Sequence, residues 1–153
     1  MFVLSAPLFC LRLTCGPEDP VAPTPDECDE PAMARVTTVE IGGADEPFLA
    51  WTHGGAAHLT RGPQGGLMIG IVIRLSGAEL PSCLAQETSV LNAARDTLVL
   101  SRTPLHTYEQ PDGSRMTRVH WLVFEAREPA VGDTLSIRAV FASTTTEHTV
   151  VVR

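Results

Sequence analysis

Apolar side chains recur at every second position in several stretches of the chain, and the longest of these is Leu67–Leu75. One side of this stretch carries Leu67, Ile69, Ile71, Ile73 and Leu75, and the other carries Met68, Gly70, Val72 and Arg74. Its β-branched residues favour a strand over a helix. Glycines and a proline at 62–66 precede it, and Ser76–Gly77 ends it. We therefore expect an interior strand of a two-layer β domain.

The same alternation predicts further strands along the chain, at 35–41, 48–51, 87–92, 97–103, 116–125, 134–142 and 148–153. Residues 105–109 are interpreted as a continuation of 97–103, whereas 52–58 and 79–86 are predicted as loops. No segment keeps a helical period beyond about two turns. Strands spaced by about ten residues and separated by Gly and Pro turns predict an antiparallel, immunoglobulin-like β-sandwich of about seven to nine strands.

The segment 116–125 is apolar on both faces near its end. Val119, Trp121 and Val123 share one face, and His120, Leu122 and Phe124 share the other. This predicts an inner strand. In the first strand, Thr37, Val39 and Ile41 are expected on one face.

The first 34 residues differ in composition from this pattern. Residues 1–14 are mostly apolar, which is typical of a secretory signal, although a wrongly assigned start or an ordinary strand would also fit. Residues 15–31 hold five prolines and six acidic residues, and such a segment buries too little apolar area to fold. The sequence thus divides into a leader (1–14), an acidic, disordered tether (15–34) and a β domain (35–153).

A cysteine at the junction of an apolar leader and a disordered tether resembles the bacterial lipoproteins. Cys15 occupies this position, with Arg12 and Thr14 where the family pattern has leucine and a small residue. The resemblance implies that Cys15 is lipidated. It also implies that the chain is exported to the bacterial cell envelope, where the lipid is its sole membrane contact.

The four cysteines are consistent with export. If Cys10 leaves with the leader and Cys15 carries the lipid, Cys28 and Cys83 remain as a possible disulfide pair, as in an oxidising compartment. The closed loop of about 55 residues would stabilise the fold by about 4 kcal/mol in the chain-entropy model. The alternative is two unrelated thiols.

A second resemblance rests on the Gly-Pro-Gln-Gly-Gly turn at 62–66, together with the closing hairpin that begins near Thr134. With these features, the chain from about Val36 resembles a group of uncharacterised bacterial lipoproteins with an immunoglobulin-like β-sandwich domain. This resemblance implies location and fold, and no activity.

Composition excludes some function classes. The formal net charge is −7, and all eleven basic residues are arginine with no basic cluster, so nucleic acid is not an expected partner. The chain has no Gly-x-Ser-x-Gly motif, and the 62–66 turn lacks the Lys and Ser/Thr of a phosphate loop. We therefore expect no enzyme and no cofactor.

Two candidate sites remain. Trp51, His53, His58 and Arg61 form a polar-aromatic loop that could contact a protein or small-ligand partner, although a single tryptophan also commonly covers the edge of a core. The leading hypothesis is thus a binding or structural module. The alternative is a periplasmic metal-binding protein using histidines, the five being His53, His58, His106, His120 and His148.

Overall fold

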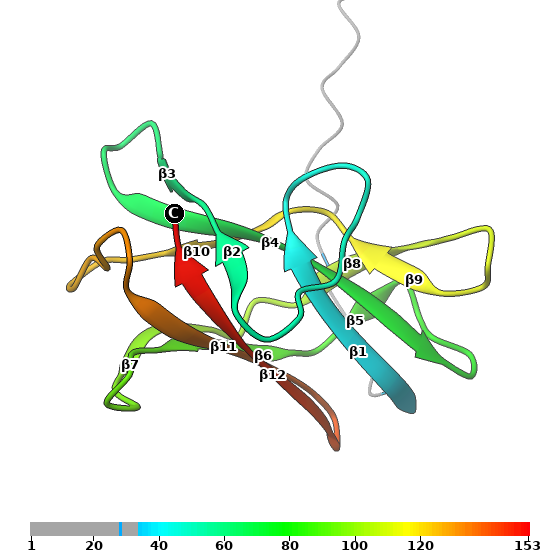
Figure 1. Cartoon of the computed structure of the whole chain (residues 1–153). Coiled ribbons are helices and arrows are strands. Elements are labelled where there is room, and N and C mark those ends of the chain that lie inside the picture. The colour runs from blue at the N-terminus through cyan, green and yellow to red at the C-terminus, as the bar shows by residue number, and fades with distance from the viewer. Residues whose placement is uncertain (1–27, 29–33) are drawn as a thin grey trace, which may run out of the picture.

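The computed structural model describes Cys28 and residues 34–153, which fold into two facing β-sheets (Figure 1). The described residues contain no helix, so the predicted all-β class is confirmed. The leader, Cys15 and most of the tether lie outside the described residues.

Seven strands form the first sheet and five form the second. The first comprises β1 (Val36–Gly43), β3 (Leu59–Arg61), β4 (Leu67–Gly77), β5 (Cys83–Leu84), β8 (Leu105–Glu109), β9 (Arg115–Thr117) and β10 (His120–Val123). The second comprises β2 (Gly55–Ala57), β6 (Glu87–Leu91), β7 (Thr97–Ser101), β11 (Thr134–Phe141) and β12 (Thr144–Val152). Neighbouring strands are antiparallel, except that β2 runs parallel to β12.

Strand β4 is the centre of the seven-stranded sheet, as its alternation predicts. β1 and β3 pair along one edge of β4, and β9 and β10 pair along the other. Beyond β9, the sheet continues with β8 and then β5. The inward side chains of β4, including Ile69, Ile71 and Ile73, are fully buried. Burying each such side chain stabilises the fold by about 1.5–3 kcal/mol.

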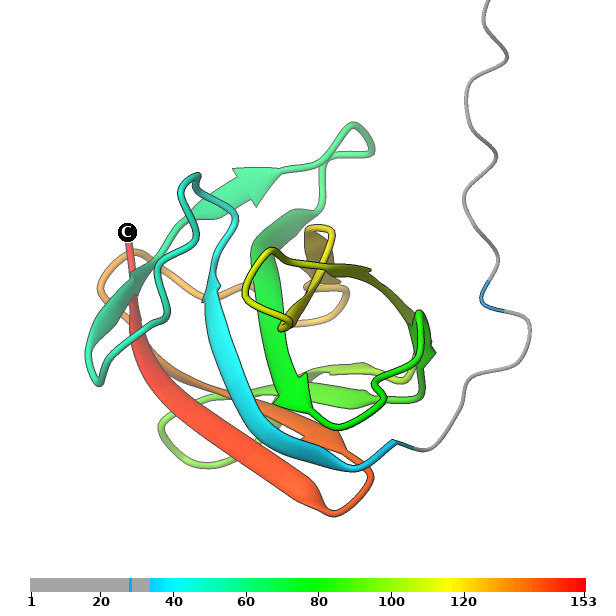
Figure 2. The same ribbon diagram turned by 90° about the vertical axis from the view of Figure 1, so that its right-hand side faces the viewer.

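The core lies between the two sheets. From β11 it receives Leu135, Ile137, Ala139 and Phe141, the alternate positions that the sequence predicts to face inward. On one side the sheets meet where β1 runs beside β12 (Figure 2), and there the Thr144 hydroxyl donates to the Val36 carbonyl at 2.6 Å. The second sheet has the order β2-β12-β11-β6-β7.

A β-bulge divides the predicted strand 116–125 into β9 and β10. Met116 pairs with Arg74 and His120 pairs with Ile71, so this chain advances four residues while β4 advances three. At the bulge, the buried Ile73 N–H donates to the Thr117 hydroxyl at 3.0 Å rather than to a strand carbonyl. One extra residue reverses which side chains face outward beyond this point.

Several predicted elements are wrong in detail. The described residues form twelve strands rather than seven to nine. The predicted loops contain β2 and β5, β3 forms where no element is predicted, β8 is separate from β7, and the bulge divides another strand. Residues 105–109 do not continue β7. They pair with β9 in the other sheet, after a crossover in which the buried Gln86 side chain donates to the Thr103 carbonyl at 2.8 Å.

The bulge and the pairings correct two further predictions. Thr37 is exposed rather than sharing the inward face with Val39, because a register shift between Val36 and Thr38 turns it outward. β10 is not an inner strand, since among the described strands it pairs with β4 alone. Residues 48–51 contribute only an isolated bridge between Ala50 and Gly42.

Candidate functional site

Three apolar side chains project from the outer face of the seven-stranded sheet, away from the core. Val119 is 36% exposed, Trp121 44% and Val123 45%, while Leu122 between them is fully buried. They alternate along β10 and the residue before it. Together with the half-buried Met68 and the buried Val72 of β4, whose side chains face the same way, we call these five residues the outer apolar face. Exposed apolar residues that lie together on one face commonly mark an interaction site.

Gly70 allows Trp121 to lie close against β4. Gly70 pairs with Trp121 in the sheet, and a Cβ atom added to it would lie 2.8 Å from Trp121 Cζ3 and 3.0 Å from Val119 Cγ1. Both distances are shorter than ordinary carbon contacts. The absence of a side chain at this position therefore lets the indole rest on the strand backbone with one side in solvent.

Two hollows flank the outer apolar face. The first, which we call the Phe48 hollow, has a volume of about 530 Å³ and is lined by Ala44, Asp45, Glu46, Phe48, Val72, Met116, Thr117, Arg118 and Val119. The second, the Met68 hollow, has about 540 Å³ and is lined by Gly62, Pro63, Gln64, Gly66, Met68, Val123, Phe124, Glu125 and Glu128. Each hollow combines an apolar floor with two carboxylates.

The predicted tight turn at 62–66 is present and forms one wall of the Met68 hollow. The Gly65 N–H donates to the Gly62 carbonyl, and the Gly62 N–H donates to the Gly66 carbonyl, each at 2.9 Å. Gly65 adopts a φ of +87°, which favours glycine. The turn therefore has a structural role that its sequence indicated.

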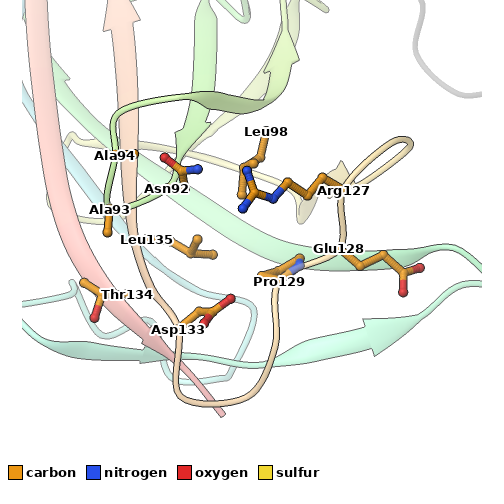
Figure 3. A pocket seen from close by; sticks show the side chains of 10 residues that line it. All are labelled: Asn92, Ala93, Ala94, Leu98, Arg127, Glu128, Pro129, Asp133, Thr134 and Leu135. Carbon is orange, nitrogen blue, oxygen red and sulfur yellow. The ribbon is translucent and has the colours of Figure 1, made fainter.

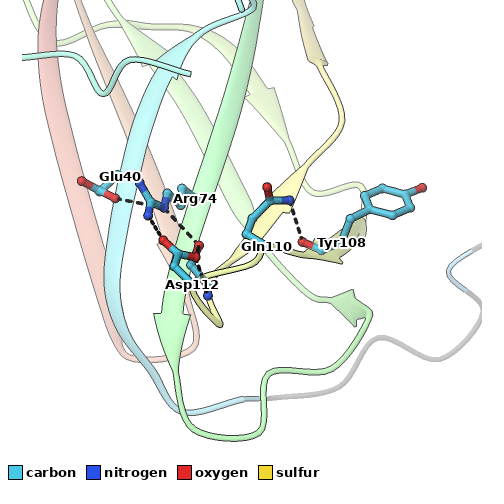
Figure 4. A network of polar contacts seen from close by, with 6 residues as sticks. Glu40, Arg74, Tyr108, Gln110 and Asp112 are labelled. Carbon is cyan, nitrogen blue, oxygen red and sulfur yellow. Dashed lines mark hydrogen bonds and ion pairs between the residues drawn. The ribbon is translucent and has the colours of Figure 1, made fainter. Parts of the chain in front are cut away.

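Near the Phe48 hollow, an ion-pair network occupies the end of β4 (Figure 4). The Arg74 guanidinium contacts the Asp112 carboxylate and lies 3.8 Å from that of Glu40. Hydrogen bonds from the Ser114 hydroxyl and backbone N–H lower the pKa of Asp112, and Arg74 lowers it further. These two carboxylates neutralise the charge of Arg74. Arg118, nearby, stacks over the Tyr108 ring at 5.0 Å.

A smaller pocket of about 270 Å³ shares Glu128 with the Met68 hollow and has Leu98 and Leu135 in its lining (Figure 3). Arg127 on its wall lies 3.8 Å from Asp96. The Asp133 carboxylate accepts from the Ala130 N–H at 2.9 Å and so serves its own turn. The lining residues include no Ser, Cys or His, and we assign this pocket no chemistry.

The loop predicted from Trp51, His53, His58 and Arg61 divides between core and surface. Trp51 is only 9% exposed and belongs to the core cluster, whereas the other three residues are exposed. The Arg61 guanidinium donates to the Gly65 carbonyl across the 62–66 turn. Trp51 is therefore not an exposed anchor, and its position corresponds to the alternative interpretation of a tryptophan that covers the core.

The histidines are distributed over both sheets. His106 pairs with Cys83, and His120 pairs with Ile71, so these two are not cross-strand partners. The Nε2 atoms of both are buried without a hydrogen-bond partner. Among the described residues, no group of three or more His, Cys, Asp or Glu side chains is arranged to hold a metal ion.

Two histidines have perturbed proton affinity. Burial lowers the pKa of His120. Burial also lowers the pKa of His148, and the nearby charge of His53 lowers it further, while Glu40 opposes both effects. The neutral imidazole is therefore favoured at both positions.

The two remaining cysteines pair as predicted. Cys28 and Cys83 lie at disulfide distance, with their Cα atoms 5.6 Å apart and a sequence separation of 55. The pair attaches Cys28, which lies in the segment predicted as a tether, to β5. Thr107 of β8 supports this segment, since its hydroxyl donates to the Pro81 carbonyl at 2.9 Å.

The shared face of Val119, Trp121 and Val123 can be read from the sequence, but its function cannot. The apolar character of both faces of this segment favours the interpretation that both are buried. Because the bulge exposes one of these faces, that interpretation missed the largest exposed aromatic side chain of the described residues.

Comparisons with known protein families, with curated proteins and with solved structures find no match to this chain. In the part of the chain that the structure describes, no helix has the length and apolar character needed to cross a membrane. The function is therefore inferred from the positions and the chemistry of the residues of this chain.

Proposed function

We propose that this chain is a non-enzymatic binding module of the bacterial cell envelope, exported and attached by a lipid on Cys15. Its domain is immunoglobulin-like, and its contact surface is the outer apolar face. The observation that carries the proposal is Trp121, a large aromatic side chain that is 44% exposed on a sheet face between two hollows. Tryptophan anchors of this kind supply much of the energy of protein interfaces.

Two further observations support the proposal. The Cys28–Cys83 pair is compatible with an oxidising compartment. The apolar leader before Cys15 and the acidic tether after it fit a domain held at a distance from a membrane.

Labelling with a palmitate analogue tests the lipid attachment. The intact chain should incorporate label in a bacterial host, and the Cys15→Ser variant should not. Equal labelling of both chains, or labelling of neither, would contradict the anchoring part of the proposal.

Site-specific photocrosslinking tests the contact surface. A crosslinking amino acid is placed at position 64 of the full chain, because Gln64 is exposed in the lining of the Met68 hollow and this position leaves Trp121 in place. A matched control carries it at position 100, because Leu100 is 49% exposed on β7 of the other sheet. We expect a discrete adduct from position 64 alone, which excess unlabelled chain suppresses and excess Trp121→Ala chain does not. Adducts from both positions, or from neither, would contradict the proposed surface.

A further inference from the structure

We infer that the outer apolar face binds an extended, basic segment of a partner protein, with a cation–x–apolar–x–cation pattern. This inference rests on the proposed function and identifies the kind of partner. It depends on the spacing of the two hollows and on the charges that surround them.

The spacing fits an extended chain. Met68 lies in one hollow and Val72 in the other, four residues apart on β4, and Gly70 beneath Trp121 is midway. Four residues of a strand span about 13 Å. In an extended peptide, side chains i, i+2 and i+4 point to the same side. Side chains i and i+4 can thus enter the two hollows while side chain i+2 rests on the indole.

The charges favour cations at both outer positions. Asp45 and Glu46 line the Phe48 hollow, and Glu125 and Glu128 line the Met68 hollow. Among the described residues, these four carboxylates form no ion pair. The two linings together contain a single basic residue, Arg118. Basic side chains with long apolar stems suit hollows that have apolar floors and acidic rims.

The same charges disfavour other occupants. The chain's own residues 15–31 carry six acidic residues and no basic one, so they would be repelled. A second copy in a symmetric contact would bring the four carboxylates against their equivalents. An anionic lipid surface would also be repelled, since acidic side chains oppose attraction to negative headgroups.

The test is fluorescence anisotropy of a labelled peptide, Gly-Arg-Thr-Leu-Thr-Arg-Gly, titrated with the full chain. Two comparison peptides replace both Arg by Glu, or Leu by Ser. We expect each replacement to weaken binding at least tenfold, and we expect binding to weaken when NaCl is raised from 0.05 to 0.5 M, because exposed charge pairs are screened.

Protein variants locate the effect. Glu125→Gln/Glu128→Gln and Asp45→Asn/Glu46→Gln should each weaken binding of the Arg peptide at least threefold. The matched control, Glu79→Gln/Glu87→Gln, removes two carboxylates outside both hollows and should leave binding unchanged. Equal weakening by the control, or equal binding of the Glu peptide, would overturn the inference.

Two more measurements address the competing occupants. Sedimentation tests for a second copy: self-association that Trp121→Ala abolishes would assign the face to a dimer contact. Flotation with phosphatidylglycerol vesicles tests for a membrane: flotation that Trp121→Ala abolishes would assign the face to a lipid surface. Either result overturns the inference. If the Arg peptide does not bind but position 64 still gives a specific crosslink, the basic-segment inference fails and the proposed function stands. If neither is seen, both fail.

Discussion

The hydroxyl of Thr117 holds the bulge that exposes Trp121, and replacing it tests this role. Thr117→Val keeps the shape of the side chain and removes the acceptor of the Ile73 N–H, which is bonded at 3.0 Å. Ile73 is fully buried and Thr117 nearly so, and the methyl group that Val puts in place of the hydroxyl cannot accept a hydrogen bond. An unsatisfied buried donor costs about 1–3 kcal/mol.

Hydrophobicity alone predicts the opposite sign. Exchanging a buried hydroxyl for a methyl group would stabilise the fold if the hydrogen bond contributed nothing. Thr117→Ser separates the two effects, because it keeps the hydroxyl and removes one methyl group worth about 1 kcal/mol. We expect the Val variant to be less stable than wild type despite its greater apolarity.

Urea denaturation at unchanged m-value measures the loss of unfolding free energy in Thr117→Val. Hydrogen exchange of the Ile73 amide shows whether that loss arises at the bulge. For a domain of this size, a loss of about 1–3 kcal/mol lowers the Tm by roughly 3–15 °C. A Val variant at least as stable as wild type, with a slowly exchanging Ile73 amide, would refute the assigned role of Thr117.

Three further predictions concern stability and the outer apolar face. Cys28→Ala/Cys83→Ala should lower the free energy of unfolding by about 4 kcal/mol in the chain-entropy model, measured by urea denaturation against the wild type without reductant. The pKa of His148 lies below the ordinary value of 6.5, so on acidification the unfolded state takes up the proton before the folded state does. The stabilising contribution should therefore be full above about pH 6.5 and fall as the pH drops below it. His148→Gln should reduce this slope, as measured by denaturation curves from about pH 5 to 8. Gly70→Ala should displace the indole and cost about 1–3 kcal/mol, with red-shifted Trp121 emission in a Trp51→Phe background.

The sequence predicts the fold where a single physical rule applies. Alternate apolar positions identify β4 and β11, because one side of each must be hidden between the sheets. Turns are predicted where glycine or proline fixes the backbone, as at 62–66, where the Gly65 N–H donates to the Gly62 carbonyl at 2.9 Å. The cysteine pair is expected on the condition that Cys10 leaves with the leader and Cys15 carries the lipid, as the lipoprotein resemblance implies.

Pairing between distant segments is not contained in such local rules. β2 has three residues with no alternation, and it forms only because β12 offers a parallel partner. Residues 105–109 alternate like β7, yet the crossover held by Gln86 carries them to the other sheet. The candidate site has the same origin, since the exposure of Trp121 depends on pairing with β4 and not on its own neighbours in sequence.

The bulge also explains why an apolar side chain is exposed here at all. Without the extra residue, the pairing of Met116 with Arg74 would place His120 over Gly70, on the outer face, and Trp121 inside, opposite Ile69. That register would bury the indole and expose the imidazole, although it would also turn Leu122, which is fully buried in the observed register, towards solvent. The observed register instead buries the His120 Nε2 without a partner and leaves Trp121 in solvent. Both the unpartnered imidazole and the exposed indole lower the stability of the fold. A binding role of the indole explains why the strand keeps this register, because departures from such local rules are concentrated at functional sites.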